Sequence, residues 1–161
     1  MIRFHQAALV SSVVLAAALA VVPPASAQNI NGVPNYGTVT LRSGFTPDPH
    51  VTNLRSGGSV DASRVSSDCS GYISGAPDVR LVYSSGSLPL IISADARADT
   101  TLVVNGPDGS WYCDDDSGDR GMNPSIRFNN PSSGRYEIWV GTYGNSSTEP
   151  AQLHISEVAS R

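Results

Sequence analysis

The residues of this sequence best suited to chemistry form an acidic run that follows a cysteine. Asp114, Asp115, Asp116 and Asp119 come directly after Cys113. Adjacent like charges repel, and such a run is tolerated where water solvates it or where a cation neutralises it. Calcium suits short Asp side chains because it takes about six to eight oxygen ligands in flexible geometry. The run therefore predicts a calcium site at 114–119, and a solvated acidic turn is the alternative.

This acidic run does not have the spacing of an EF-hand. An EF-hand loop ends on a Glu at its twelfth position, whereas the residue at that distance from Asp114 is Ser125. Gly118 and Gly121 allow the chain to curl around an ion. In the solvated alternative, Arg120 and Arg127 offset part of the negative charge.

The sequence offers few residues for nucleophilic catalysis. All ten basic residues are Arg, which excludes lysine chemistry. Ser117 follows an Asp and precedes a Gly, as the nucleophile of trypsin-like peptidases does, but Asp115 and Asp119 flank it and oppose a developing oxyanion. His50 falls in a turn and His154 on the solvent face of an expected strand, so neither is placed as a general base.

Paired carboxylates are the other route to hydrolysis. Besides the aspartates, Glu137, Glu149 and Glu157 are available, but a chain of this length leaves little room for a substrate cleft beside a core. We therefore expect a protein that is not an enzyme, and a small hydrolase remains as an alternative.

Aromatic side chains suggest a second kind of site. Trp111, Trp139 and Tyr143 offer flat rings that can stack on sugars, which would make the protein a carbohydrate-binding module. The competing interpretation is that both Trp rings cover the hydrophobic face of a small sandwich. A coplanar exposed pair beside the acidic run would favour the sugar, and buried rings would favour a structural or protein-interaction role.

Composition and the first residues indicate the compartment. Residues 1–27 contain Arg3, an apolar run from Ala7 to Val22 and a small-residue triplet ending at Ala27, which is typical of a signal peptide. We expect cleavage after Ala27, a secreted or periplasmic protein, and no membrane span in the mature chain. The net charge of -4 argues against nucleic acid as a partner and leaves an unidentified protein or polysaccharide.

The two cysteines are interpreted in the light of that compartment. In an exported chain, Cys69 and Cys113 as the only pair most simply form one disulfide. A reactive or metal-binding thiol pair is the alternative, but no cluster of His or Cys accompanies them.

The pattern of short apolar segments predicts an all-β fold. Helical periodicity is missing after residue 27, whereas segments rich in β-branched and aromatic residues recur between turn residues. We expect an antiparallel β-sandwich, jelly-roll-like, of about 8–9 strands with one disulfide. The expected strands span 36–42, 50–54, 79–83, 88–94, 100–105, 110–113, 125–128, 135–142 and 151–157. They form a single domain at 36–161 that follows a flexible N-terminal tail at 28–35.

Several details refine this map. Asn105 to Gly109 has turn chemistry and predicts a hairpin between its flanking strands. Alternation places Tyr136, Ile138 and Val140 on the core side of their strand. In the last strand, Leu153, Ile155 and Val158 are the inward candidates, with a strand end or bulge before Val158. The segment 44–67 is the least regular part, and we expect one strand and a long loop there.

Two motifs of the second half resemble the bacterial pre-peptidase C-terminal domain family. One is Thr101-Leu102-Val103-Val104 followed by Gly106-Pro107-Asp108-Gly109 and the acidic run. The other, more specific motif is the segment Asn130-Pro131-Ser132-Ser133-Gly134-Arg135-Tyr136-Glu137-Ile138-Trp139-Val140. The resemblance covers residues 78–158 and implies a small secreted β-sandwich that serves as a calcium- or collagen-binding accessory module of peptidases.

Together these observations predict a secreted binding or accessory module without catalytic activity that binds calcium through its acidic run. A carbohydrate-binding module is the first alternative. A peptidase-associated protein or small hydrolase is the second.

Overall fold

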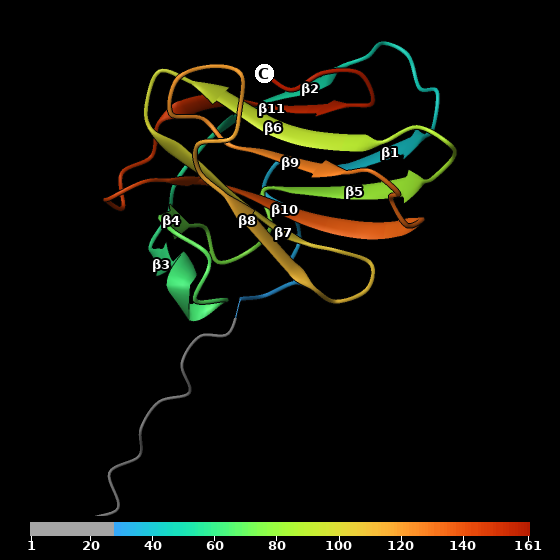
Figure 1. Ribbon diagram of the computed structural model, residues 1–161. Coiled ribbons are helices and arrows are strands. Elements are labelled where there is room, and N and C mark those ends of the chain that lie inside the picture. The colour runs from blue at the N-terminus through green and yellow to red at the C-terminus, as the bar shows by residue number, and fades with distance from the viewer. Residues whose placement is uncertain (1–27) are drawn as a thin grey trace, which may run out of the picture.

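Residues 28–161, which a computed structural model describes, form a two-layered β-sandwich (Figure 1). The expected signal peptide at 1–27 lies outside the described residues. All nine expected strands are present: β1 Thr38–Arg42, β2 His50–Arg55, β5 Val79–Ser84, β6 Leu90–Ala96, β7 Thr100–Asn105, β8 Trp111–Asp114, β9 Ser125–Phe128, β10 Gly134–Thr142 and β11 Pro150–Ser156. The expected all-β sandwich with one disulfide is therefore confirmed.

The sequence did not predict two very short strands, β3 Val60–Asp61 and β4 Tyr72–Ile73, or the 3-10 turn η1 Ala62–Arg64 between them. They fall in and just after the segment for which one strand and a long loop were expected. Two residues are too few to show an alternating pattern, so a strand of this length leaves no signal in the sequence.

The strands are divided between two sheets. The seven-stranded sheet A follows the order β1-β5-β10-β4-β3, with β7 paired to β10 and β8 to β7, and the four-stranded sheet B has the order β2-β11-β6-β9. All described pairs are antiparallel except β1 with β5, which is parallel. The chain crosses from β1 to sheet B before it reaches β5, so no hairpin forces these two strands to run in opposite directions. The wholly antiparallel arrangement that the sequence suggested is wrong at this edge.

Apolar side chains from both sheets meet between the layers. Tyr136, Ile138 and Val140 face this core as expected, and so do Leu153 and Ile155 from β11. The hairpin between β7 and β8 closes where Gly106 N–H donates to the Ser110 carbonyl at 2.9 Å. Val158 does not point inward: β11 ends at Ser156, and the Val158 side chain is 78% exposed.

A second, smaller cluster lies on the outer face of sheet A. Trp139 and Val103 face away from the main core, and the segment from Val60 to Ile73 covers them. The disulfide between Cys69 and Cys113 links this segment to β8. Complete burial of the Trp139 ring contributes about 4 kcal/mol at the usual area coefficient.

Residues 28–35 also pack on the sandwich. Asn29 N–H donates to the Gly75 carbonyl at 3.2 Å, and Asn35 N–H donates to the Pro77 carbonyl at 2.8 Å. The Asn35 side chain adds a hydrogen bond to Asp78 at 3.0 Å, and Arg80 donates to the Ile30 carbonyl. These hydrogen bonds attach residues 29–35 to the start of β5 and to the residues just before it.

Candidate functional site

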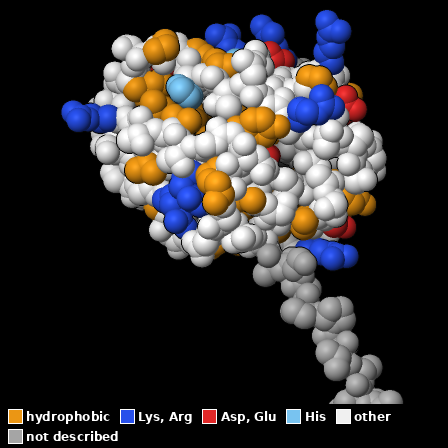
Figure 2. Space-filling model, turned by 180° about the vertical axis from the view of Figure 1, so that it is seen from behind, with side chains coloured by type: hydrophobic (Ala, Val, Ile, Leu, Met, Phe, Trp, Pro, Cys, Tyr) orange, Lys and Arg blue, Asp and Glu red, His pale blue; other side chains and the backbone are white. Residues whose placement is uncertain are grey.

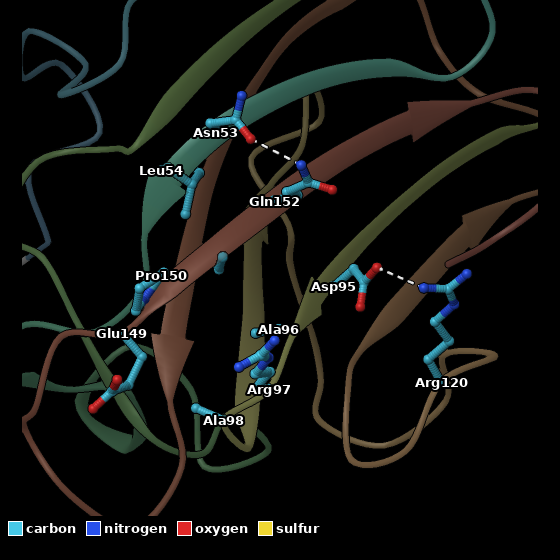
Figure 3. A pocket seen from close by; sticks show the side chains of 11 residues that line it. Asn53, Leu54, Asp95, Ala96, Arg97, Ala98, Arg120, Glu149, Pro150 and Gln152 are labelled. Atoms are coloured by element: carbon cyan, nitrogen blue, oxygen red, sulfur yellow. Dashed lines mark hydrogen bonds and ion pairs between the residues drawn. The ribbon is translucent and has the colours of Figure 1, made fainter.

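A groove of about 720 Å³ crosses the outer face of sheet B (Figure 3). Its walls come from β2, from the end of β6 with the turn after it, from the β8–β9 loop and from the start of β11. The lining residues are Asn53, Leu54, Asp95, Ala96, Arg97, Ala98, Arg120, Glu149, Pro150, Ala151 and Gln152.

Strand register places three polar side chains in a row on this face. Gln152 of β11 lies opposite Asn53 of β2 on one side and opposite Asp95 of β6 on the other. All three point away from the core because side chains alternate along a strand. The Gln152 amide donates to Asn53 at 2.9 Å, which fixes the orientation of both amides. The row thus presents amide and carboxylate groups across three neighbouring strands.

Charged side chains stand at the rim of the groove. Arg120 from the β8–β9 loop forms an ion pair with Asp95 at 3.2 Å. Among the described residues, the Arg97 and Glu149 side chains have no ion pair or hydrogen-bonding partner at all. One cation and one anion therefore remain available to a ligand.

The acidic run lies beside this region, but its carboxylates have separate roles. The Asp114 carboxylate accepts hydrogen bonds from Ser117 N–H at 2.9 Å, from the Ser117 hydroxyl at 2.6 Å and from Ser125 N–H at 2.8 Å. Asp114 therefore closes the β8–β9 loop. Asp115 accepts from the Ser70 hydroxyl at 3.1 Å.

Asp116 and Asp119 accept no hydrogen bond within residues 28–161. Over the same residues, no group of three or more His, Cys, Asp and Glu side chains is arranged to hold a metal ion. Sequence reasoning missed Asp99, whose pKa is raised by partial burial and then by the charges of Asp116 and Asp115. These three carboxylates repel one another across the start of β7.

The aromatic residues do not form an exposed platform. Trp139 is fully buried, and its ring lies 5.5 Å from that of the half-buried Trp111 at an angle of 41°. Trp139 has no free face for a sugar, which corrects its assignment as a stacking residue. Tyr143 is 48% exposed and lies beside Asp99, whose carbonyl accepts a hydrogen bond from Tyr143 N–H.

The histidines and glutamates considered for catalysis in the sequence occupy different environments. His154 points away from the core as expected but is only 6% exposed, so its assignment to a solvent face is wrong. Burial lowers its pKa, and neither ring nitrogen has a hydrogen-bond partner. Glu137 is also buried, held between Arg80 at 2.6 Å and Arg135 at 2.7 Å. Within the described residues no hydroxyl or thiol is hydrogen-bonded to a histidine.

Arginine side chains are scattered over the face seen in Figure 2, with uncharged surface and some acidic side chains between them. A continuous basic patch of the kind that nucleic acids require is not visible on that face. The structure has, within residues 28–161, no helix with the length and apolarity that a bilayer crossing requires.

The fold places the chain among two-sheet β-sandwiches with one disulfide. Among solved structures it is similar to PliG of Aeromonas hydrophila, a periplasmic lysozyme inhibitor of g-type lysozyme, with 14% identity over 74% of this chain and 96% of that chain and a TM-score of 0.39. Such a distant similarity does not transfer a function. No family model and no curated protein matches the sequence, so the resemblance to pre-peptidase C-terminal domains stays a prediction.

Proposed function

We propose that the protein is a non-catalytic binding module whose ligand occupies the groove across sheet B. The observation that carries this proposal is the row Asn53, Gln152 and Asp95 beneath a rim on which Arg97 and Glu149 are unpaired. A concave site with convergent polar groups is the usual form of a ligand site. The charges of opposite sign around it make the groove nearly neutral as a whole.

The same proposal includes export. The disulfide Cys69–Cys113 is typical of an oxidising compartment, and the leader expected at 1–27 would deliver the chain there. A periplasmic or extracellular location follows from these two features together.

The groove itself can be tested by comparing paired variants. The domain 28–161 would be screened on peptide and glycan arrays as the wild type and as Arg97→Ala/Glu149→Ala, which removes one charge of each sign. Arg42→Ala/Asp68→Ala is the matched control, because both of its residues are exposed and lie outside the groove. We expect ligands whose signal falls at least about tenfold in the groove variant and is unchanged in the control. An array without ligands, or ligands that bind both variants equally, would overturn the proposal.

Calcium binding by the acidic run is a second proposal. It is favoured by the negative charge around Asp99: after partial burial, the charges of Asp116 and Asp115 raise the pKa of this carboxyl, and a divalent cation would offset them. Thermal melting in millimolar calcium and in chelator tests it. Calcium at about ten times its dissociation constant stabilises a domain by about 1.4 kcal/mol, a rise of about 5 °C here. Asp116→Asn should abolish the rise and Asp68→Asn should retain it. Equal melting temperatures in calcium and chelator would contradict the proposal.

A further inference from the structure

Residues 158–161, which follow β11 and are called the cover below, lie over part of the outer face of sheet B. The chain turns back after Ser156 and runs over the sheet (Figure 1). Val158 N–H and Ala159 N–H both donate to the Ser156 hydroxyl, at 3.0 and 3.1 Å. Arg161 N–H donates to the Ser93 hydroxyl of β6 at 3.1 Å. A polypeptide main chain is therefore held on this face by serine hydroxyls.

The strip of sheet B beneath the cover, which contains Ser93 and His154, is continuous with the open groove. His154 lies two residues beyond Gln152 on β11, and Ser93 lies two residues before Asp95 on β6, so all four side chains are on one face. Ser93 and His154 are directly opposite each other in the register. The groove and the strip are thus two halves of the same surface, one open and one occupied.

Side-chain hydrogen bonds of Glu157 anchor the start of the cover, whereas farther along it a single main-chain hydrogen bond, from Arg161 to Ser93, joins it to the sheet. The Glu157 carboxylate accepts from the Tyr83 hydroxyl at 2.6 Å and from Gly44 N–H at 2.7 Å, which fixes the start of the segment. Beyond it, the side chains of Val158, Ala159 and Arg161 are exposed.

The packing under the cover is also incomplete. Both ring nitrogens of His154 and the Ser160 hydroxyl are buried without a hydrogen-bond partner. Buried polar atoms without partners weaken a contact, so residues 158–161 are easier to displace than any strand of the sheet.

We infer that the outer face of sheet B binds a short extended peptide of a partner protein, and that this peptide displaces residues 158–161. The inference rests on the proposed function of the groove and names its ligand class. The chain's own main chain already occupies half of the face, and the open half adds an unpaired Arg97 and an unpaired Glu149. These complement a peptide that carries charges of both signs. Within the lining of the groove there is no aromatic ring on which a sugar would stack.

The experiment measures binding in trans of a peptide with the chain's own sequence from 156 to 161. The probe is acetyl-Ser-Glu-Val-Ala-Ser-Arg-amide, titrated into isotope-labelled domain 28–161 and followed by the amide signals. Arg161→Pro removes the N–H that the cover donates to Ser93 and leaves the Ser93 hydroxyl free to accept from the probe. Arg161→Ala is the matched control, because it loses the same exposed side chain and keeps the N–H.

The expected result is a shift of the amides at 152–154 and of the displaced residues 158–160, with binding about fivefold tighter in Arg161→Pro than in wild type or Arg161→Ala. The loss of one hydrogen bond weakens the cover by about that factor. Equal affinity in the three proteins, or no shift in Arg161→Pro at peptide concentrations on the order of 5 mM, would overturn the inference.

Further probes separate this inference from the proposed function. A peptide with both charged residues replaced by Gln should bind more weakly than the charged probe. Cellopentaose is the sugar probe. If it shifts the groove residues and the peptide does not, the proposed function stands and the peptide inference fails. If the peptide shifts only the groove amides and leaves those of residues 158–160 unchanged, displacement of the cover is refuted.

Discussion

Replacement of Glu137 by Gln should destabilise the fold, because this carboxylate is the centre of a buried charge network. Its side chain is 1% exposed, and one oxygen lies 2.6 Å from Arg80 and 2.7 Å from Arg135. The other oxygen has no partner, so the amide of Gln fits there without a new conflict. The variant therefore removes the charge and keeps the shape.

The magnitude follows from the burial of the partners. The loss of one member of a buried ion pair costs about 3 to 5 kcal/mol, and we expect the lower end because Arg80 is 19% and Arg135 46% exposed. With an unfolding entropy of about 0.28 kcal/mol/K for this length, about 3 kcal/mol corresponds to a melting temperature about 10 °C lower.

The assay is thermal and urea unfolding followed by circular dichroism, with Glu149→Gln as the control, because the half-buried Glu149 carboxylate makes no ion pair or hydrogen bond among the described residues. Arg80 also donates to the carbonyls of Ile30 and Gly32, and Arg135 donates to Asn31. Amide exchange of residues 29–36 should therefore accelerate in Glu137→Gln. A change below about 1 kcal/mol would refute the assignment of Glu137 as the anchor of the N-terminal segment.

Two further predictions concern Asp78 and the turn at Gly57. Burial raises the pKa of Asp78 to about 6, against the hydrogen bonds from Asn35, Val140 and Ser74. The folded state thus retains a proton that the unfolded state releases, so the free energy of unfolding should fall by up to about 3 kcal/mol as pH rises from about 4 to 6. Urea titrations should show this slope in wild type and not in Asp78→Asn. Gly57→Ala should lower the free energy of unfolding by more than about 3 kcal/mol, because its Cβ would lie 1.9 Å from a backbone oxygen. Gly37→Ala is the control, since Gly37 has a similar φ but open space around it, and it should lower that free energy by about 1 kcal/mol. Equal melting temperatures of the two variants would contradict this prediction.

Local patterning was enough to predict most of the sandwich. The nine longer strands alternate or are rich in β-branched residues and end at turn residues, so their positions follow from nearest neighbours. The parallel pairing of β1 with β5 depends on where the chain crosses between sheets, which no local pattern encodes. The sequence also did not predict the segment that packs over Trp139. The alternation of side chains along a strand shows that a residue points away from the core, but it does not show what packs against that residue.

No pattern in the sequence predicts the groove on sheet B. Its central row joins Asn53, Asp95 and Gln152, which lie far apart in the chain and meet only through the register of β2, β11 and β6. None of the three belongs to a sequence motif, whereas the acidic run can be recognised in the sequence because its charged residues are adjacent. His154 is a similar case. The alternation of side chains along β11 predicted its orientation correctly, but its burial beneath residues 158–161 could not be predicted from the sequence.

The acidic residues divide according to what their oxygens already accept. Asp114 accepts from two backbone N–H groups, and Asp48 accepts from Glu157 N–H and the Ser156 hydroxyl. Such carboxylates satisfy donors at irregular points of the backbone, so their loss should destabilise the fold whatever the ligand. The side-chain carboxylates of Glu149 and Asp116 accept no hydrogen bond within the described residues. Side-chain variants of these two residues should therefore not lower the melting temperature of the unliganded domain, and any loss of binding in them reports on the groove or the acidic run itself.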